Sequence, residues 1–361
     1  MKVFLVAGAR PNFMKIAPIY RASLACNNID CQIVHTGQHY DHEMSQAFFD
    51  DLEIPQPQFY LEAGSGTHAV QTAKIMVSFE KICLEEKPDL VLVVGDVNST
   101  LACSIVAKKL LIKVAHVEAG LRSFDLTMPE EINRMVTDAI SDYFFVTEES
   151  GVKNLLREGK DEKSIHFIGH VMIDNLFHQL KKLESEDVMK FSVFSTKPQN
   201  NNYAFMTLHR PSNVDDEKTF SGIAEALNEI AKELIILFPV HPRTKKMMEQ
   251  FQIRFSENIK LLPPLGFKES LFLWKDAKVV LTDSGGLQEE TTALKIPCVT
   301  IRENTERPIT VEIGTNVLAG TTKEGILKAY RECFEKVKTV SIPPLWDGHA
   351  AERIMKVLTK F

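Results

Sequence analysis

Apolar segments of strand length alternate with amphipathic segments of helix length along almost the whole chain. Strand-like runs at 3–7, 32–35, 90–94 and 113–117 are each followed by a stretch typical of a helix or a helix start. Such βαβ order favours parallel strands whose connecting helices cover both faces of the sheet. The sequence therefore predicts an α/β fold built on doubly wound parallel sheets.

This alternation is interrupted once. Residues 184–202 are polar and Asn-rich at their end, which predicts a linker and a loop, and the alternation resumes at 203–208. A chain of 361 residues is also longer than one core usually serves. We therefore predict two Rossmann-like domains, at 1–170 and 171–346, and two such domains facing each other would form a cleft.

Ligands of open α/β sheets bind beyond the carboxyl ends of the strands, so the residues after each strand are informative. The apolar strand at 279–281 is followed by Ser284, Gly285 and Gly286, and then by a helix. Unpaired N–H groups and the helix dipole at such a helix start attract phosphate. Glu290, one turn into the helix, could bond a ribose hydroxyl. An ordinary capped turn explains the glycine pair equally well when the pair is taken alone.

Basic side chains follow the other strands of the second predicted domain. His209, His241 and Arg302 each come at or just after a predicted strand end, and Arg243 and Arg307 lie close behind. Together with the Ser-Gly-Gly turn, these strand ends favour a diphosphate site over a chance arrangement. The second domain is thus predicted to hold an anion.

Acidic side chains follow the strands of the first predicted domain. Asp96 comes after 90–94, Glu118 comes after 113–117, and Glu130 and Glu131 begin a helix. One of this last pair is expected in the helix first turn and the other at the ligand. Clustered carboxylates raise one another's pKa and suit acid–base chemistry. A divalent metal is the alternative, but the ligand spacing expected of a metal site is missing.

The turn after the first strand contains Gly8 but lacks the GxGxxG pattern of dinucleotide-binding folds, so no nicotinamide cofactor is expected. Arg10 and Lys15 follow it, and they could supply positive charge to a ligand or form a solvated pair at a helix start. A nucleotide diphospho-sugar fits both domains, with its diphosphate on one and its sugar on the other.

Composition and charge limit the partners and the cellular compartment that the chain is expected to have. The net charge of −6 argues against nucleic acid as the main partner. No apolar run approaches membrane-spanning length, and the apolar N-terminal run is too short for a signal peptide. The six cysteines form no CxxC pair, which favours buried free thiols in a reducing cytoplasm.

These segments together resemble the non-hydrolysing UDP-N-acetylglucosamine 2-epimerases over essentially the whole chain. The resemblance rests on many short motifs in the same order. They lie at 8–11 with Lys15, and at 36–39, 95–96, 116–122, 129–134, 209–210, 239–242, 282–290, 305–308 and 347–350.

The resemblance implies a glycosyltransferase-B-like fold, a homodimer, and a C-terminal helix at 347–361 that returns to the first domain. No cofactor and no metal are expected, on the missing motifs described above. The resemblance also implies two sets of site residues. UDP would be contacted by Arg10, His209, Ser284, Gly285, Gly286, Glu290 and Arg307. Lys15 and the catalytic candidates Asp96, Glu118 and Glu130 would surround the sugar. Apart from the resemblance, the chemistry also allows His209 as a catalytic candidate in a proton relay.

The implied reaction is reversible C2 epimerisation of UDP-N-acetylglucosamine to UDP-N-acetylmannosamine, which supplies precursors of surface polysaccharides. The C2 proton is not next to a carbonyl, so simple removal and return is unfavourable. Elimination of UDP to 2-acetamidoglucal followed by re-addition avoids this difficulty. It needs carboxylates at the sugar and held cations and dipoles at the leaving diphosphate.

The chain departs from the family pattern at two places. The segment 38–44 differs in spacing from the segment at which many bacterial members bind an activating UDP-sugar. Ser270, with Phe267 and Phe272 nearby, stands where many members place an aromatic residue at the uracil.

Other functions compete with this interpretation. They are epimerisation of a diacetamido-uronic or deoxy UDP-sugar, a hydrolysing epimerase that releases UDP and N-acetylmannosamine, a glycosyltransferase, and a non-enzymatic UDP-sugar binder. The binder would have no need of the three acids together.

Overall fold

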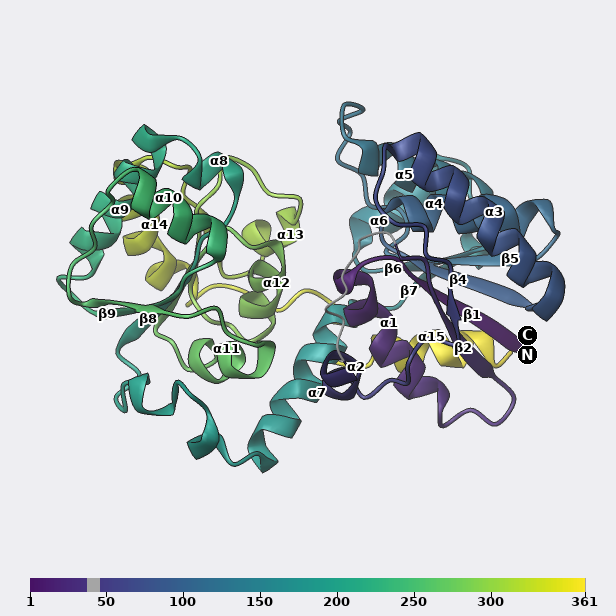
Figure 1. Cartoon of the computed structure of the whole chain (residues 1–361), viewed down its shortest axis with the longest axis horizontal. Coiled ribbons are helices and arrows are strands. Elements are labelled where there is room, and N and C mark those ends of the chain that lie inside the picture. Colours follow the sequence, from purple (N-terminus) through teal and green to yellow (C-terminus); the bar gives the residue numbers. More distant parts are fainter. Residues whose placement is uncertain (38–45, 361) are drawn as a thin grey trace. The chain divides into compact units, whose positions relative to one another are not determined.

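The computed structural model describes residues 1–37 and 46–360. The chain forms two compact units, which are Met1–Asn175 with Pro344–Phe361 (unit 1) and Leu176–Pro343 (unit 2) (Figure 1). Each unit is built on one parallel sheet with helices on both faces, so the predicted pair of doubly wound α/β sheets is confirmed. Within the described ranges, no helix combines the length and the apolar character needed to cross a bilayer.

Unit 1 contains a seven-stranded sheet of order β3-β2-β1-β4-β5-β6-β7, and every strand pair is parallel. The direction of winding reverses between β1 and β4, and this reversal is the topological switch point at which α/β sheets bind ligands. The strands are β1 (Lys2–Ala7), β2 (Asp30–His35), β3 (Phe59–Tyr60), β4 (Leu90–Val94), β5 (Lys113–Val117), β6 (Tyr143–Val146) and β7 (Ile165–Phe167).

The helices of unit 1 pack through apolar stripes onto the two faces of this sheet. On one face, Phe13 and Ile16 of α1 pack with Ile354 of α15 against β1 and β4. On the other, Ile75 and Phe79 of α3 pack with residues of α4. The helices are α1 (Arg10–Ser23), α2 (Gln46–Leu52), α3 (His68–Glu86), α4 (Asn98–Lys109), α5 (Pro129–Ile140), α6 (Glu149–Arg157), the start of α7 (Val171–Ser185) and α15 (Ala350–Leu358), with a 3-10 turn η1 (Glu162–Ser164).

Helix α15 follows unit 2 in the chain but belongs to the core of unit 1. The Asp174 carboxylate of α7 accepts hydrogen bonds from the N–H groups of Ala350 (3.0 Å) and Ala351 (2.6 Å), and it therefore caps the first turn of α15. Burial raises the pKa of Asp174 to about 6. Gly169 allows the segment that leads into α15 to pass close to the backbone of unit 1, since a Cβ at Gly169 would lie 2.0 Å from the Leu345 carbonyl oxygen.

Unit 2 contains a six-stranded parallel sheet of order β10-β9-β8-β11-β12-β13, with its own switch point between β8 and β11. Its strands are β8 (Tyr203–Thr207), β9 (Ile235–Pro239), β10 (Ile259–Leu262), β11 (Val279–Thr282), β12 (Cys298–Thr300) and β13 (Asn316–Leu318). Its helices, besides the rest of α7, are α8 (Pro211–Val214), α9 (Glu217–Ile230), α10 (Pro242–Gln250), α11 (Phe267–Trp274), α12 (Gly285–Ala293), α13 (Pro308–Glu312) and α14 (Lys323–Lys336).

The polar stretch predicted as linker and loop is more ordered than expected. It contains the end of α7 and two 3-10 turns, η2 (Val188–Lys190) and η3 (Phe194–Thr196). Phe191 and Phe194 pack on Phe272 of α11, with ring centroids 5.5 and 6.2 Å apart. Two isolated aromatic residues hold the stretch in place, and they are too sparse to produce a periodic pattern.

Candidate active site

Glu118 lies at the carboxyl edge of the unit 1 sheet and is held through one carboxylate oxygen. It directly follows β5 with φ +70°, a left-handed conformation that is uncommon outside glycine. Its Oε2 accepts a hydrogen bond of 2.7 Å from Lys15 Nζ of α1. Its Oε1 is buried and has no hydrogen-bond partner among the described residues. One carboxylate oxygen is thus fixed and the other is available to a ligand.

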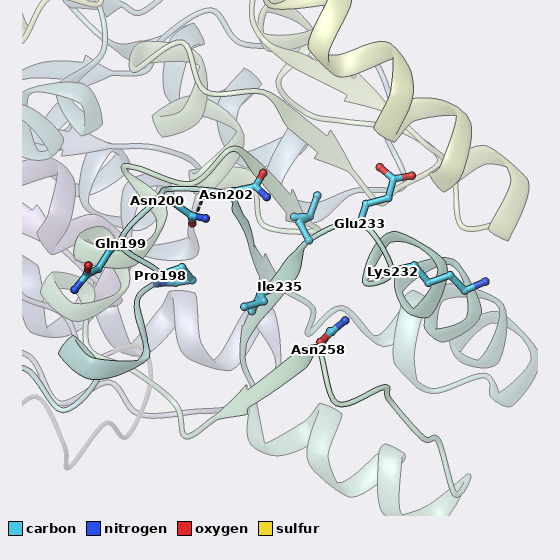
Figure 2. Close-up of a pocket in the computed structure, with 9 residues that line it drawn as sticks. Pro198, Gln199, Asn200, Asn202, Lys232, Glu233, Ile235 and Asn258 are labelled. Carbon is cyan, nitrogen blue, oxygen red and sulfur yellow. Dashed lines mark hydrogen bonds between the residues drawn. The ribbon is translucent and has the colours of Figure 1, made fainter.

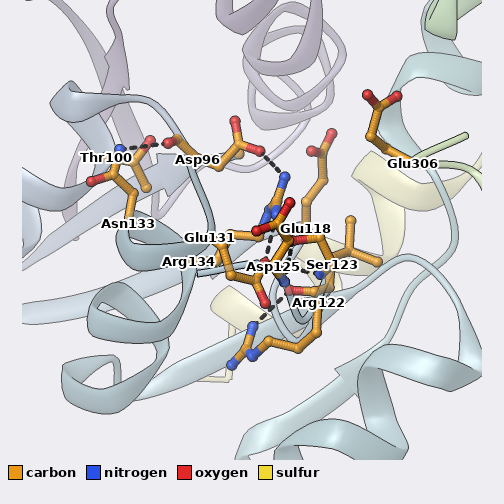
Figure 3. A network of polar contacts seen from close by, with 12 residues as sticks. Asp96, Thr100, Glu118, Arg122, Ser123, Asp125, Glu131, Asn133, Arg134 and Glu306 are labelled. Atoms are coloured by element: carbon orange, nitrogen blue, oxygen red, sulfur yellow. Dashed lines mark hydrogen bonds and ion pairs between the residues drawn. The ribbon is translucent and has the colours of Figure 1, made fainter. Parts of the chain in front are cut away.

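Asp96 lies at the end of the neighbouring strand β4. Arg134 of α5 donates from Nη2 to Asp96 Oδ2 over 2.6 Å, while the Asn133 side chain donates to the Asp96 carbonyl over 2.8 Å (Figure 3). The Asp96 side chain keeps 30% of its surface exposed. Asp96 is therefore anchored to α5 and still accessible.

The structure separates the roles of Glu130 and Glu131. Glu131 is buried and accepts hydrogen bonds from the N–H groups of Ser123 (2.9 Å) and Phe124 (3.0 Å) and from Arg134 (2.7 Å) (Figure 3). Burial alone would raise the pKa of Glu131, but these bonds outweigh it and lower the pKa. Glu130 is partly exposed and makes no hydrogen bond or ion pair with the described residues. Glu131 thus holds the loop, and Glu130 is the acid left for a ligand.

Two residues next to these acids shape the site without reacting. Asn12 is buried, accepts from the N–H of Gly8 (3.3 Å) and donates to the Val94 carbonyl (3.3 Å), so it ties the ends of β1 and β4 together at the switch point. A Cβ on Gly95 would lie 2.9 Å from Lys15 Nζ. The missing side chain of Gly95 therefore makes room for the Lys15–Glu118 pair.

Arg10 is exposed at the start of α1, with its guanidinium carbon 4.9 Å from the centre of the Phe48 ring.

A fully buried ion cluster lies behind Glu118. Asp138 of α5 is 2.6 Å from His116 Nδ1 and 2.7 Å from Arg122 Nη1, and it accepts from the N–H of Gly120 over 2.9 Å. Burial alone would raise the pKa of Asp138, but His116, Arg122 and Gly120 lower it. The loop that carries Glu118 is therefore bound to an ionised carboxylate.

In unit 2, Asp283 orients His209 at the carboxyl ends of β8 and β11. Asp283 is fully buried, and its Oδ2 accepts from the N–H groups of His209 and Arg210, each over 2.8 Å. Its Oδ1 lies 2.8 Å from His209 Nδ1. Burial would raise the pKa of Asp283, but the contacts with His209 and Arg210 lower it. His209 is therefore held through Nδ1, and its Nε2 makes no hydrogen bond or ion pair with the described residues.

The start of α12 has the free space and free donors of an anion site. The helix begins at Gly285, two residues earlier than the sequence suggested, and the Ser284 side chain makes no capping bond. The first N–H groups of an α-helix have no partner within the helix. Among the described residues, a Cβ on Gly285 would meet nothing within 4 Å, and one on Gly286 would meet only Ser284 Oγ at 4.0 Å. No contact within this part of the chain explains the glycine pair, so it leaves space for a ligand.

Glu290 and Arg307 are both linked to Glu289. Burial, and then the charge of Glu289, raises the pKa of Glu290 to about 8. Glu289 is ion-paired with Arg307 Nε, which orients the guanidinium. Nearby in the sequence, Arg302 donates two hydrogen bonds of 2.7 Å to Glu306 and lowers the pKa of Glu306 to about 2.

A cavity of about 270 Å³ lies beside His209 within unit 2. Ser270 lines it, whereas Phe272 is buried beneath Phe191 and Phe194. Its mixed apolar and polar walls suit a nucleotide base. The lining residues are Thr207, Leu208, His209, Pro239, His241, Pro264, Leu265, Ser270, Ser284 and Leu287.

A larger pocket of about 470 Å³ lies at the opposite, amino-terminal edge of the same sheet (Figure 2). Several of its polar groups are already paired: Asn258 donates to the Ala231 carbonyl (2.8 Å), and Lys232 pairs with Glu229 (2.6 Å). The smaller cavity is the better ligand site because it adjoins His209 and the start of α12.

The predicted site residues thus fall into two groups, one in each unit. Unit 1 brings together Lys15, Asp96 and Glu118, with Glu130 on the helix that anchors Asp96. Of the predicted UDP contacts, Arg10 lies in unit 1, and unit 2 carries the others, His209, Ser284, Gly285, Gly286, Glu290 and Arg307. The predicted activator segment 38–44 lies outside the described residues. Among the described residues, no group of three or more His, Cys, Asp or Glu could hold a metal ion.

Comparisons with known proteins agree across the chain. The model of the family "UDP-N-acetylglucosamine 2-epimerase" matches residues 22–359. A protein of that name from Methanocaldococcus jannaschii is 45% identical over 99% of both chains. A Pseudomonas aeruginosa protein named UDP-2,3-diacetamido-2,3-dideoxy-D-glucuronate 2-epimerase is 37% identical over 100% of both.

Solved structures give the same result. The Methanocaldococcus jannaschii UDP-GlcNAc 2-epimerase in complex with UDP-GlcNAc and UDP has a TM-score of 0.86 and 44% identity, covering 100% of both chains. The chain belongs to the UDP-N-acetylglucosamine 2-epimerase family.

Proposed function

We propose that this protein interconverts UDP-N-acetylglucosamine and UDP-N-acetylmannosamine by reversible epimerisation at C2. The observation that carries the proposal is Glu118, whose Oε2 is fixed by Lys15 and whose buried Oε1 has no partner within the described part of the chain. A carboxylate held in this way is a preorganised acid–base group. The family membership and the UDP-GlcNAc complex of the Methanocaldococcus jannaschii relative support the substrate.

The reaction proceeds by elimination and re-addition. A carboxylate takes the C2 proton while the bond from C1 to the diphosphate oxygen breaks, giving 2-acetamidoglucal and UDP. UDP then adds back at C1, and C2 receives a proton on the opposite face. Two faces need acid–base groups at two positions, and the candidates are Asp96, Glu118, Glu130 and His209 through its Nε2.

In this proposal the unit 2 residues stabilise the leaving UDP. The N–H groups at Gly285 and Gly286, the Ser284 hydroxyl and the guanidinium of Arg307 meet the diphosphate, with Arg10 as a further cation. Glu290 bonds the ribose hydroxyls. The cavity beside Ser270 takes the uracil. No cofactor or metal takes part in the proposed steps.

The test is incubation with UDP-N-acetylglucosamine in D₂O, followed by proton NMR. Formation of UDP-N-acetylmannosamine, with deuterium at C2 of both epimers, supports reversible elimination. Epimerisation without deuterium at C2 contradicts it. Release of UDP and free N-acetylmannosamine would place the protein in the hydrolysing class.

The acids are tested by the variants Asp96→Asn and Glu118→Gln. Each removes a carboxylate charge while keeping the side-chain size, so we expect turnover to fall by at least about 10²-fold. UDP binding, measured by calorimetry, should persist because its proposed contacts lie on other residues. Full activity in both variants would contradict the catalytic assignment.

A second candidate substrate is a diacetamido-uronic UDP-sugar. The Pseudomonas aeruginosa relative, named for that sugar, matches the full length of the chain at 37% identity. The same NMR experiment with UDP-2,3-diacetamido-glucuronate decides between the two, through the ratio of kcat/KM values.

We further propose that the protein is a cytoplasmic homodimer that supplies a surface polysaccharide precursor. Val70, Val77 and Leu84 are seven residues apart along α3 and 48%, 59% and 57% exposed. This spacing forms one apolar stripe suited to packing against the same helix of a second copy. Six free cysteines suit a reducing compartment. Light scattering should give twice the chain mass of 40.8 kDa.

A further inference from the structure

One face of α5 carries charged residues toward the interior. Glu131, Arg134 and Asp138 are three and four residues apart, so they lie on the same side of the helix. All three are buried. Burying charge is unfavourable unless each group is paired, so this face has a specific arrangement of partners. Glu131 and Arg134 hold the 123–124 loop and Asp96, as described above (Figure 3).

Asp138, the third of these residues, binds the chain both before and after Glu118. His116, two residues before Glu118, is 2.6 Å from Asp138 Oδ1. Gly120, two residues after Glu118, donates its N–H to Asp138 Oδ2 over 2.9 Å. The other ring nitrogen of His116, Nε2, lies 2.9 Å from the carbonyl oxygen of Gly95 and so ties the loop to the end of β4.

The backbone between these two anchor points is in an unfavourable conformation. Glu118 has φ +70°, a left-handed conformation that is unfavourable for a residue with a Cβ. Such conformations persist only where the surroundings over-determine them, and they concentrate at functional sites. The loop is also closed from behind, since a Cβ on Gly120 would lie 2.3 Å from the carbonyl oxygen of Gly151.

We infer that Asp138 is a positioning residue that holds Glu118 in its left-handed conformation and so aims Oε1 at the reacting sugar carbon. The inference rests on the proposed epimerase function. Asp138 acts through His116, Gly120 and Arg122 and does not itself touch substrate. A misplacement of about 1 Å in a reacting group can cost about 10²-fold in rate.

A purely structural role is the competing explanation, and the chain offers a matched control for it. Asp142, just beyond α5, binds the opposite end of β5: it accepts from Lys108 Nζ (2.8 Å) and from the Val114 N–H (2.8 Å). Asp142→Asn therefore removes a carboxylate that anchors the start of β5, whereas Glu118 follows the end of this strand.

The experiment compares Asp138→Asn and Asp142→Asn with the wild type in kcat, KM, UDP affinity and urea unfolding. We expect Asp138→Asn to lower kcat by about 10–100-fold. KM and UDP affinity should change by less than about twofold, since the UDP candidates in unit 2 are untouched. Asp142→Asn should lose stability but keep its kcat. Equal kcat in the two variants, or equal losses in kcat and UDP affinity for Asp138→Asn, would overturn the inference.

A crystal structure of Asp138→Asn separates this inference from the proposed function, because it shows the φ of Glu118 directly. Departure from the left-handed region supports the inference, and an unchanged Glu118 overturns it, whether or not the wild type proves to be an epimerase. If Asp138→Asn fails to fold, His116→Gln takes its place, because it changes the other partner of the His116–Asp138 contact. It is judged by its kcat relative to its UDP affinity and by the φ of Glu118.

Discussion

At the scale of single residues, Gly95 makes a sharp prediction about the Lys15–Glu118 pair. A Cβ at this position would lie 2.9 Å from Lys15 Nζ, and its φ of +67° already disfavours any side chain. We expect Gly95→Ala to displace Lys15 and to lower kcat by about tenfold or more. The measurement is steady-state epimerase kinetics at saturating substrate.

The control for Gly95→Ala is Gly159→Ala. Gly159 has φ +80° and open space around its Cβ position, so the variant carries the backbone cost without the clash. Both variants should lose about 1 kcal/mol of unfolding free energy from the positive φ. A kcat that falls equally in both would show that backbone strain, not the Lys15 contact, is responsible.

Glu290 makes a prediction about pH. Its folded-state pKa is raised from 4.5 to about 8, so between these values the folded chain keeps a proton that the unfolded chain has released. The stabilising contribution of Glu290 is therefore full below pH 4.5 and is lost as the pH rises towards 8. The side chain introduced by Glu290→Gln does not titrate. Between pH 5 and 8 the unfolding free energy of the wild type should therefore fall relative to that of the variant. Parallel urea-unfolding curves across this range would contradict the prediction.

The sequence predicted which residues follow the strands, and what those residues bind stays a prediction. Asp96 and Glu118 could be placed at the edge of the sheet because a strand end fixes where the next side chain lies. The strand pattern alone did not choose between Glu130 and Glu131, since that choice depends on the 123–124 loop folding back over α5, and only the family resemblance named Glu130. Asp138 gave no signal, because a single acid inside a helix resembles an ordinary solvated residue. Asp283 directly follows β11, and its position could have indicated its role.

At the scale of elements, α15 makes a prediction about stability. Ile354 is fully buried against unit 1. Truncation of a buried isoleucine to alanine costs about 2–5 kcal/mol. Ile354→Ala should therefore lower the urea midpoint clearly, while the control Lys356→Ala, an exposed position of the same helix, should leave it nearly unchanged. Equal midpoints would mean that α15 contributes little to the core.

Elements of ordinary length were predicted well, and some of the shortest were missed. Periodicity needs several residues to be recognised, so α3 with 19 residues was clear while β3 with 2 residues and α8 with 4 residues were not. The start of α12 was misjudged because glycine has a low helix propensity, which the favourable end position of Gly285 and Gly286 overrides.

At the scale of the whole molecule, two separate cores predict two unfolding events. Unit 1 and unit 2 each have their own apolar cluster. UDP at about 100 times its dissociation constant should stabilise the unit that binds it by about 2.7 kcal/mol. In scanning calorimetry, UDP should therefore raise the midpoint temperature of one transition, and Ile354→Ala should lower the midpoint temperature of the other. If both changes act on a single transition, the two units unfold together.

The position of α15 has a consequence for the order of synthesis. About 180 residues separate Asn175 from the end of α15, and nearly all of them form unit 2. At about 5–20 residues per second, the ribosome needs roughly 10–40 s to make them. During that time Phe13 and Ile16 lack the helix that covers them, and the whole of unit 2 is made before α15 appears. The first half of the chain to be translated is therefore the last to complete its core, and a nascent chain in this interval is a natural client for a chaperone.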